Sequence, residues 1–230
     1  MIKSLVFDSG PIISLTMNNL LWTLKELKNR FKGRFYISEG VKKELVDRPL
    51  ASKKFKFEAL QVLKCIDEGV LEVIDNGKVD EYANEILELS NQCFAVQGHN
   101  LNLFHYGEIS GIAACKFLGA KIFAVDERTT RLVIEAPDRL IDILERTMHT
   151  NVDVNRENLN KLSEFTRDIQ LIRSVELATR AYEIGLLDEY LLKIKDPKRT
   201  LLESILWGVK LNGCSVSRRE IERILEFEKI

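Results

Sequence analysis

Short apolar runs alternate with longer helix-like patterns along this chain. Residues 4–7 form a β-prone run that Asp8 ends, and residues 12–27 repeat the apolar spacing of a helix. After Gly33, the aromatic and β-branched residues 35–37 predict a second strand. The chain is therefore expected to begin with a strand–helix–strand unit, and Asp8 stands at the end of its first strand.

The alternation continues through the middle of the chain. Ser38 is a good N-cap for a helix over residues 39–46, and Arg48-Pro49 is expected to end that helix. The following pattern predicts, in order, a helix near 57–68, a strand at 70–74, a helix over 80–96, a polar loop at 97–100, a helix from Gly107-Glu108 to Leu118 and a strand at 121–125. Asp126-Glu127 follows this last strand directly, so a second strand is expected to end in acids.

The second half of the chain has mainly helical patterns. They predict a helix at 140–148, an ambiguous segment at 152–154, a helix capped by Asn155, a strand at 169–172, and helices that end at Ile184, begin at Asp196-Pro197 and run over 218–228. Strands that alternate with helices indicate a mainly parallel sheet covered on both faces, and such sheets bind ligands beyond the carboxyl ends of their strands. Asp8 and Asp126 fall at those ends.

Composition indicates one elaborated, soluble domain. The chain has 230 residues, 45% apolar and 30% charged, which is the balance of a globular protein. Its apolar runs stop far short of the roughly 20 residues of a membrane span, and a charged residue comes too early for a signal peptide. The cysteines are isolated from one another. We therefore expect a cytoplasmic protein with reduced core thiols and no membrane segment.

The charge balance limits how nucleic acid could bind. A formal net charge of −1 argues against a surface that binds a polyanion over its whole extent, so any such site must be local. The densest basic stretch comprises Lys42, Lys43, Arg48, Lys53, Lys54 and Lys56. A run of this kind is also typical of a solvated surface, and the sequence leaves both readings open.

The acids suggest a metal site. Mg²⁺ and Mn²⁺ prefer carboxylate and water oxygens, and two such ions can stabilise the attacking and leaving oxygens of a phosphodiester displacement. Unpaired buried carboxylates repel one another, and a cation would relieve that repulsion. Simpler alternatives stay open. Asp8 and Asp126 could merely cap the next helix, and Glu44 and Glu108 could be solvated helix residues.

Four segments, taken together and in this order, resemble the PIN domain family. They are Leu5-Val6-Phe7-Asp8-Ser9, residues 37–45 with Glu44 in a V-x-x-E-L pattern, Gly107-Glu108 before Ile112-Ala113-Ala114, and residues 122–126. In that family the first acid ends strand one, the second lies in the V-x-x-E-L helix, and the others flank an Ala-rich helix and end a later strand. The resemblance implies catalytic and metal-binding roles for Asp8, Glu44, Glu108 and Asp126.

A narrower resemblance covers the tail of the chain. The G-E-x-x-x-I-A pattern, the doubled acid Asp126-Glu127, the following Arg131 and the segments 181–187, 200–211 and 217–225 are similar to a prokaryotic PIN subfamily of predicted nucleic-acid-binding proteins. This resemblance implies a three-layer α/β/α fold with a PIN core at 1–134. A mainly helical insertion at 135–168 would follow, and then the last core strand and C-terminal helices at 169–230, all within one domain.

The resemblance also implies an activity, namely hydrolysis of RNA phosphodiester bonds with Mg²⁺ or Mn²⁺. The preference for RNA over DNA rests on it alone. Glu127 is a further expected metal ligand, and either Glu127 or Asp126 could make the closer contact. The candidate substrate-binding residues are Ser9, Lys42, Lys43, Arg128 and Arg131. The serine could instead shape its turn, and the arginines could form surface ion pairs.

One departure from the family pattern keeps other functions open. His105 stands where the subfamily often has an acid, and we interpret it as a loop or hydrogen-bonded residue because imidazole suits Mg²⁺ poorly. The chain could therefore be a noncatalytic RNA-binding or assembly module. A HAD-like phosphatase, suggested by residues 6–10, is disfavoured because Gly10 cannot supply the acid that this chemistry needs.

Partners are predicted only in outline. PIN domains commonly pair, so a homodimer is plausible, and apolar helix faces in the insertion could supply its interface. An antitoxin partner is less expected, because toxins that share this core are usually much shorter than this chain.

Overall fold

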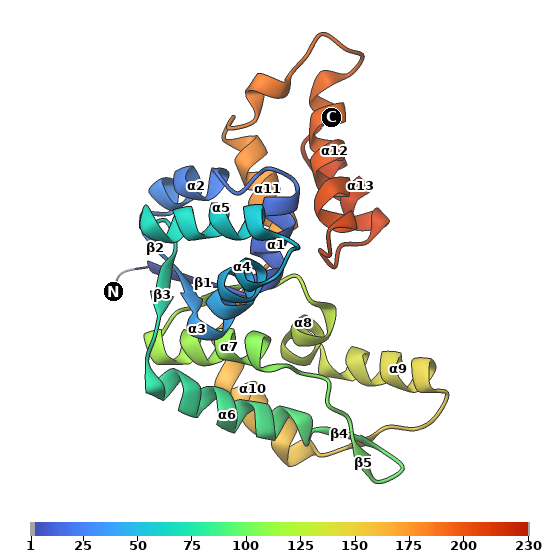
Figure 1. Cartoon of the computed structure of the whole chain (residues 1–230). Helices are drawn as coiled ribbons and strands as arrows, with labels where there is room; N and C mark the ends of the chain where they lie inside the picture. The colour runs from blue at the N-terminus through green and yellow to red at the C-terminus, as the bar shows by residue number, and fades with distance from the viewer. Residues whose placement is uncertain (1–2, 230) are drawn as a thin grey trace.

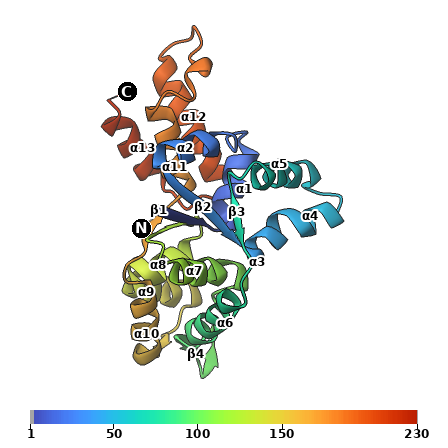
Figure 2. The same cartoon turned by 90° about the vertical axis from the view of Figure 1, so that its left-hand side faces the viewer.

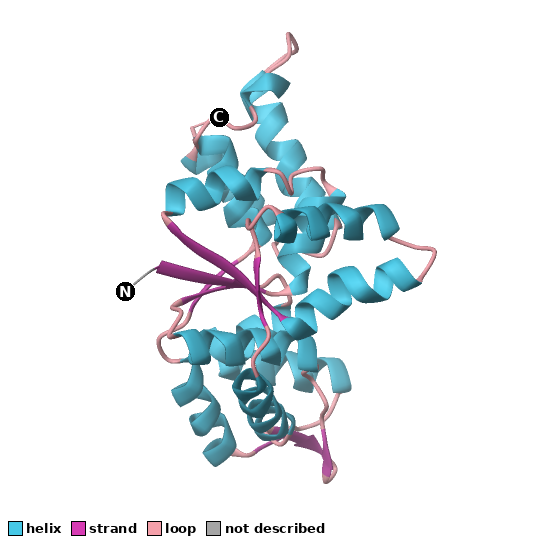
Figure 3. Ribbon diagram, turned by 60° about the vertical axis from the view of Figure 1, so that its left-hand side comes forward, coloured by secondary structure: helices cyan, strands magenta, loops and turns pink. Residues whose placement is uncertain are grey.

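Five parallel strands form the centre of the molecule, seen in a computed structural model that describes residues 3–229 (Figure 1). They are arranged in the order β3-β2-β1-β6-β8 and comprise β1 (Lys3–Phe7), β2 (Gly33–Ser38), β3 (Glu72–Ile74), β6 (Ile122–Ala124) and β8 (Gln170–Ile172). Helices cover both faces, as Figure 3 shows from another side. This confirms the predicted three-layer α/β/α class with a parallel central sheet.

Side-chain alternation along the strands divides the interior into two cores. Successive strand residues point to opposite faces, so Leu5 and Phe7 enter one core while Val6 enters the other. The first core lies under α1 (Ser9–Met17), α2 (Thr23–Phe31), α5 (Lys56–Asp67), α11 (Ser174–Glu183), α12 (Pro197–Leu211) and α13 (Arg218–Phe227). The second lies under α6 (Gly77–Asn91), α7 (Tyr106–Leu118), α8 (Arg128–Glu135), α9 (Pro137–Met148) and α10 (Arg156–Thr166).

Helix α7 lies unusually close to the sheet. A Cβ atom at Gly111 would come within 2.4 Å of the ring of Phe123 in β6, so only glycine allows this approach. The same helix begins beside the carboxyl end of the sheet, which places Glu108 near the end of β1. Close packing in the middle of α7 thus fixes the position of its N-terminal acid.

Two expected helices are divided or shortened, which corrects the sequence interpretation. Residues 12–27 form α1 and α2 with a break at Asn19, whose φ of 56° is a left-handed conformation that asparagine tolerates. The helix expected over 80–96 ends at Asn91. Residues 94–100 form instead a hairpin whose turn residues Gln97 and Gly98 both have positive φ, as a type I′ turn requires.

The hairpin belongs to a second, three-stranded antiparallel sheet. It consists of β4 (Phe94–Val96), β5 (His99–Asn100) and β7 (Asp153–Val154) in the order β5-β4-β7. β7 lies in the predicted 135–168 insertion, and Leu140 and Leu162 of the same segment join the core that contains Ile112 of α7. The segment therefore packs as part of the lower helical layer, where Figure 2 shows α9 and α10 beside α7 and α8.

The C-terminal part extends the opposite layer. Helices α11 and α12 pack on α1 and on each other, and α13 packs on α12. A short 3₁₀ turn, η2 (Asp188–Tyr190), lies between α11 and α12. In residues 3–229, each helix is too short or too polar to cross a membrane.

Candidate functional site

A cavity of about 620 Å³ opens at the carboxyl ends of the strands, beside β1 and β6. The chain runs from β1 toward β3 on one side and continues through β6 to β8 on the other, so this is the point where the strand order reverses. Ligands bind at such points in parallel sheets. The lining comprises Asp8, Ser9, Gly10, Glu39, Gly40, Lys43, Glu44, Arg48, Asp80, His105, Tyr106, Gly107, Glu108 and Glu127.

Asp8 lies at the floor of this cavity and is only 4% exposed. Its backbone N–H donates to the Ala124 carbonyl at 2.9 Å, which joins the end of β1 to β6. Its Oδ2 accepts from the Gly10 N–H at 3.3 Å, so the side chain also caps α1. The buried Oδ1 has no hydrogen-bond partner among the described residues. Capping therefore explains one carboxylate oxygen and leaves the other unexplained.

The electrostatic environment of Asp8 favours its protonated form. Burial raises its pKa from 3.8 to about 7. Hydrogen bonds from the Ser9 and Gly10 backbone lower the pKa, whereas the negative charges of Glu108 and Glu44 raise it further. A carboxyl group with a pKa near 7 in a cavity is typical of functional sites.

Glu44 reaches the cavity from an irregular helix. The helix expected to end at Arg48-Pro49 continues instead as α3 (Glu39–Lys42), the π-helical turn η1 (Lys43–Asp47) and α4 (Arg48–Ala51). The Arg48 N–H donates to the Lys43 carbonyl, which is the i→i−5 bond of a π turn. Pro49 lacks an N–H, and the wider turn lets the helix accommodate it. Glu44 is in this turn, next to the N-terminus of α7. Its Oε2 lies so close to Gly107 that a Cβ atom added to this glycine would be only 3.1 Å from it.

Glu108 is the third residue of α7. Its Oε2 accepts from the His105 N–H at 3.2 Å, which makes it part of the cap of this helix. Burial raises the pKa of Glu108, and the charge of Glu127 raises it as well, while the His105 backbone lowers it. His105 itself is the exposed N-cap residue of α7 and lines the cavity rim. This placement is that of a helix-capping loop residue.

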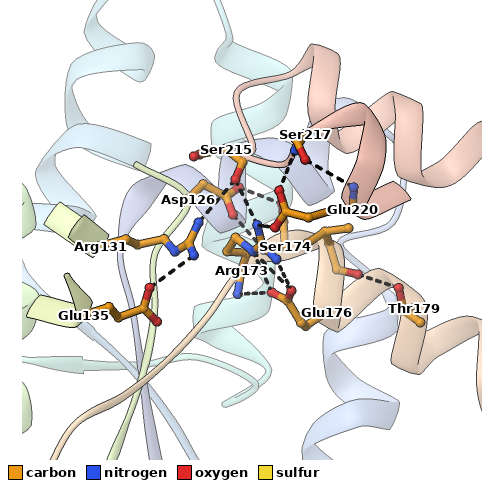
Figure 4. Close-up of polar contacts among 11 residues, drawn as sticks. Asp126, Arg131, Glu135, Arg173, Ser174, Glu176, Thr179, Ser215, Ser217 and Glu220 are labelled. Carbon is orange, nitrogen blue, oxygen red and sulfur yellow. Dashed lines mark hydrogen bonds and ion pairs between the residues drawn. The ribbon is translucent and has the colours of Figure 1, made fainter. Parts of the chain in front are cut away.

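The doubled acid divides between two environments. Glu127 lines the cavity, and its Oε2 accepts from the Thr130 N–H at 2.6 Å as the N-cap of α8. Asp126 points away into the protein (Figure 4), where it accepts bonds of 2.7 Å from Ser14 Oγ, Ser174 N–H and Ser174 Oγ. Both oxygens of Asp126 are therefore bonded to protein groups, and Glu127 is the member of the pair that faces the cavity.

Asp126 belongs to a buried polar cluster that holds the C-terminal helices on the core. Its backbone carbonyl accepts from the Ser215 N–H at 3.1 Å. Arg131 and Arg173 both donate to the Ser215 carbonyl, at 3.2 and 3.0 Å (Figure 4). Arg173 also pairs with Glu220 of α13 at 2.8 Å. Segments near residues 126, 173 and 215 are thus fixed to one another.

The predicted substrate residues fall in different places. Ser9 and Lys43 line the cavity, and Arg48, from the same basic stretch, lines it too. Lys42 instead pairs with Glu39 at 3.6 Å. Arg131 is bound to Ser215 and Glu135 in the polar cluster, and the exposed Arg128 is outside the cavity lining.

Two cavity residues had no signal in the sequence. The Tyr106 hydroxyl donates to the Asp80 carboxylate, which joins the starts of α7 and α6 across the rim. Burial, together with this bond, raises the pKa of Tyr106 to about 12. Both residues come from helices whose periodicity says nothing about which polar side chains meet, so only the packing of α6 on α7 brings them together.

The donor chemistry of the cavity suits a divalent cation, but the carboxylates do not converge on one point. Asp8, Glu44, Glu108 and Glu127 supply oxygen ligands of the type that Mg²⁺ and Mn²⁺ prefer, and the buried Oδ1 of Asp8 is free to accept one more bond. Over residues 3–229, no group of three or more His, Cys, Asp or Glu side chains is close enough to hold an ion as arranged. Binding would require the glutamates to rotate toward Asp8.

The raised pKa of Asp8 predicts a pH-dependent stability. Between about pH 4 and pH 7 the folded state holds a proton that the unfolded state has lost, so the free energy of unfolding decreases as the pH rises through this range. The full effect is on the order of 4 kcal/mol at 1.36 kcal/mol per pKa unit. Urea denaturation of metal-free protein at pH 5 and pH 8 measures it. Equal changes in the wild type and in Asp8→Asn would contradict this assignment.

Comparison with known proteins adds no relative. No family model matches the sequence, and no significant match to the chain was found among curated proteins or among solved structures.

Proposed function

We propose that this chain is a metal-dependent nuclease that hydrolyses RNA phosphodiester bonds, with a site of the PIN type. The observation that carries the proposal is the Asp8 carboxyl, buried with one unpartnered oxygen in a cavity that also contains Glu44 and Glu108. The order of the acid-bearing segments along the chain supports the same reading.

Asp8 supports this function through the free energy of its burial. A buried carboxylate is costly unless its charge is neutralised and its oxygens are bonded, and neighbouring acids increase that cost. Burial of Asp8 and the charges of Glu44 and Glu108 all raise the free energy of its ionised form. Near neutral pH a proton can neutralise the charge of one carboxylate. A divalent cation can neutralise the charges of several neighbouring carboxylates together. The position of this arrangement at a ligand-binding point of the sheet favours a cation as the functional partner.

Four acids would hold the ions, namely Asp8, Glu44, Glu108 and Glu127. Bound Mg²⁺ or Mn²⁺ would lower the pKa of an attacking water and stabilise charge on the leaving 3′ oxygen. Asp8 is held in place by its bonds to Gly10 and Ala124, so it is the fixed member of the set. The glutamates are longer, and they approach from η1, from the first turn of α7 and from the N-cap of α8.

The remaining cavity residues would position the substrate. Lys43 and Arg48 are exposed cations at the rim, where they can bind the phosphates beside the scissile bond. Ser9 follows the first acid directly and can hydrogen-bond a water at the site. The choice of RNA over DNA comes from the family resemblance.

The test is cleavage of single-stranded and structured RNA by the full chain with Mn²⁺, Mg²⁺ or EDTA. We expect Mn²⁺-dependent cleavage, and a decrease of about 100-fold or more in Glu44→Gln, because loss of a direct ligand should cost at least as much as loss of a supporting residue. Glu226→Gln is the matched control, an exposed helical glutamate of α13 that lines neither the acid cavity nor the space beside it. Inactivity of the wild type with every metal would refute the nuclease proposal.

Two observations favour a second candidate, a noncatalytic RNA-binding or assembly module. The acids do not form a ready ligand set within residues 3–229, and His105 replaces an acid of the family pattern. Such a module would bind RNA with unchanged affinity after Glu44→Gln and would leave the RNA intact.

Two further proposals concern context. We propose a cytoplasmic location, which the free thiols Cys65, Cys93, Cys115 and Cys214 support because reducing compartments keep cysteines unpaired. A homodimer through the 135–168 segment stays a prediction, and the molecular mass in solution would test it.

A further inference from the structure

A second hollow adjoins the acid cavity. It has a volume of about 200 Å³ and lies between α1 and the start of α5, and it is lined by Ile13, Thr16, Met17, Glu44, Leu45, Pro49, Phe55 and Glu58. Glu44 lines both spaces, so this one side chain borders the hollow and the proposed metal site. Apart from two glutamates and a threonine, its walls are apolar.

The segment beside this hollow alternates cations with exposed aromatic rings. Phe55 and Phe57 are 56% and 70% exposed, and Lys53, Lys54 and Lys56 flank them. All three lysines are exposed. Large apolar side chains at this exposure cost solvation free energy, and a run of positive charge around them discourages burial against another apolar surface.

The cations near the hollow are free to bind an external anion. Of the ion pairs found across residues 3–229, none involves the three lysines of this segment, and none involves Lys43 or Arg48 at the cavity rim. Lys42, in contrast, is paired with Glu39. Five unpaired cations therefore extend from the acid cavity past Pro49 to Phe57.

We propose that residues 53–57 form a platform that binds an unpaired stretch of nucleic acid and directs it into the acid cavity. Phe55 and Phe57 stack on bases, and the three lysines contact the phosphates between them. Aromatic rings beside a positive groove are the usual means of binding single strands without sequence preference. This inference rests on the proposed function, and it adds a selection for single-stranded over paired substrate.

Charge complementarity favours single-stranded nucleic acid over an apolar protein surface as the ligand of this platform. A single strand offers flat apolar bases and regularly spaced negative charges, which match alternating rings and lysines. A second copy of this chain would bring the same positive segment, and like charges would repel. A paired duplex hides its bases from Phe55 and Phe57, so the rings would gain nothing from it.

The test measures binding in a chain that cannot cleave. A fluorescent oligouridylate is titrated with Asp8→Asn, and with the same chain that also carries Phe55→Ala or Phe57→Ala. Each ring deletion is expected to weaken binding by roughly 5- to 100-fold, the range for loss of one stacked base. Phe55→Tyr should keep the affinity, and Phe227→Ala should not change it, because this 81% exposed ring lies at the far end of α13.

The probes separate stacking from charge. An abasic oligomer keeps the phosphates but lacks the bases, so it should bind weakly and should not respond to Phe55→Ala. Replacement of Lys53, Lys54 and Lys56 by glutamine should reduce the slope of log Kd against log salt concentration by about 2, at about 0.7 per phosphate contact. Thermal melting of each variant confirms that it is folded.

The outcomes distinguish this inference from the nuclease proposal. If Phe55→Ala and Phe57→Ala bind the oligomer as the parent does, the platform is refuted even if the wild type cleaves RNA. If the ring variants lose binding but no metal supports cleavage, the platform stands and the nuclease proposal fails. Equal binding of Phe55→Leu, with no loss for the abasic oligomer, would indicate that phosphate charge alone holds the strand, and it would also overturn the inference.

Discussion

Replacing Asp8 by asparagine should remove Mn²⁺-dependent cleavage and, in metal-free buffer at pH 8, make the protein more stable. Cleavage should decrease by about 10³-fold, the upper range for loss of one fixed electrostatic group in an active site. Stability should increase because the amide cannot ionise, whereas at pH 8 the wild-type carboxyl is charged, buried and close to two acids. Its carbonyl can still accept from the Gly10 N–H.

The free energy of unfolding is expected to increase by about 2 kcal/mol. Removal of the buried charge should stabilise the fold by on the order of 4 kcal/mol, and burial of an amide with unsatisfied hydrogen-bonding groups should offset part of this gain. This corresponds to about 4–8 °C in melting temperature for a chain of this size. Asp138→Asn is the control, since that side chain is 83% exposed and remote from the cavity. Unchanged cleavage in Asp8→Asn would remove the residue from the site, and a lower melting temperature would contradict its raised pKa.

Replacing Asp126 by alanine should destabilise the fold by about 3–5 kcal/mol, the range for breaking a buried charged network. Both donors of Ser174 would lose their acceptor in the interior, and Ser14 Oγ would keep only its 3.3 Å bond to the Asn212 carbonyl. The melting temperature should decrease by roughly 10 °C. Denaturant titration with tryptophan fluorescence measures the change. A loss below about 1 kcal/mol would mean that these bonds do not hold the core.

Glu127→Gln is the variant to compare with Asp126→Ala, because Glu127 is the neighbouring acid and faces the cavity. Its side-chain oxygen can still accept from the Thr130 N–H, so stability should change by less than about 1 kcal/mol. Cleavage should fall by about 100-fold. If Asp126→Asn abolished cleavage in a folded protein while Glu127→Gln cleaved normally, the roles of the two acids would be reversed.

The strand ends could be predicted because their signals are local. Asp8 and the doubled acid each follow a short apolar run, and a parallel sheet brings such ends together. The orientation of Asp126 could not be predicted, since its partners Ser14 and Ser174 are more than 40 residues away in the chain. No periodicity encodes a bond of that kind.

Irregular backbone segments also could not be predicted from the sequence. Pro49 normally ends a helix, and the sequence favoured that reading. The π turn at Lys43–Asp47 let the helix continue, because its wider spacing satisfies the backbone around the proline. The hairpin at residues 94–100 was missed because two short strands resemble the end of a buried helix, and only the left-handed Gln97-Gly98 turn distinguishes them.

The central place of β1 has a consequence for synthesis on the ribosome. β1 can pair with β2 as soon as residue 38 has emerged, but its other neighbour, β6, is made more than 80 residues later. Glu108 and Glu127 arrive with that later part of the chain, so the nascent protein holds Asp8 and Glu44 without their partners. Under the proposed nuclease function, a growing chain is therefore expected to be inactive, which would protect the message from which it is being translated.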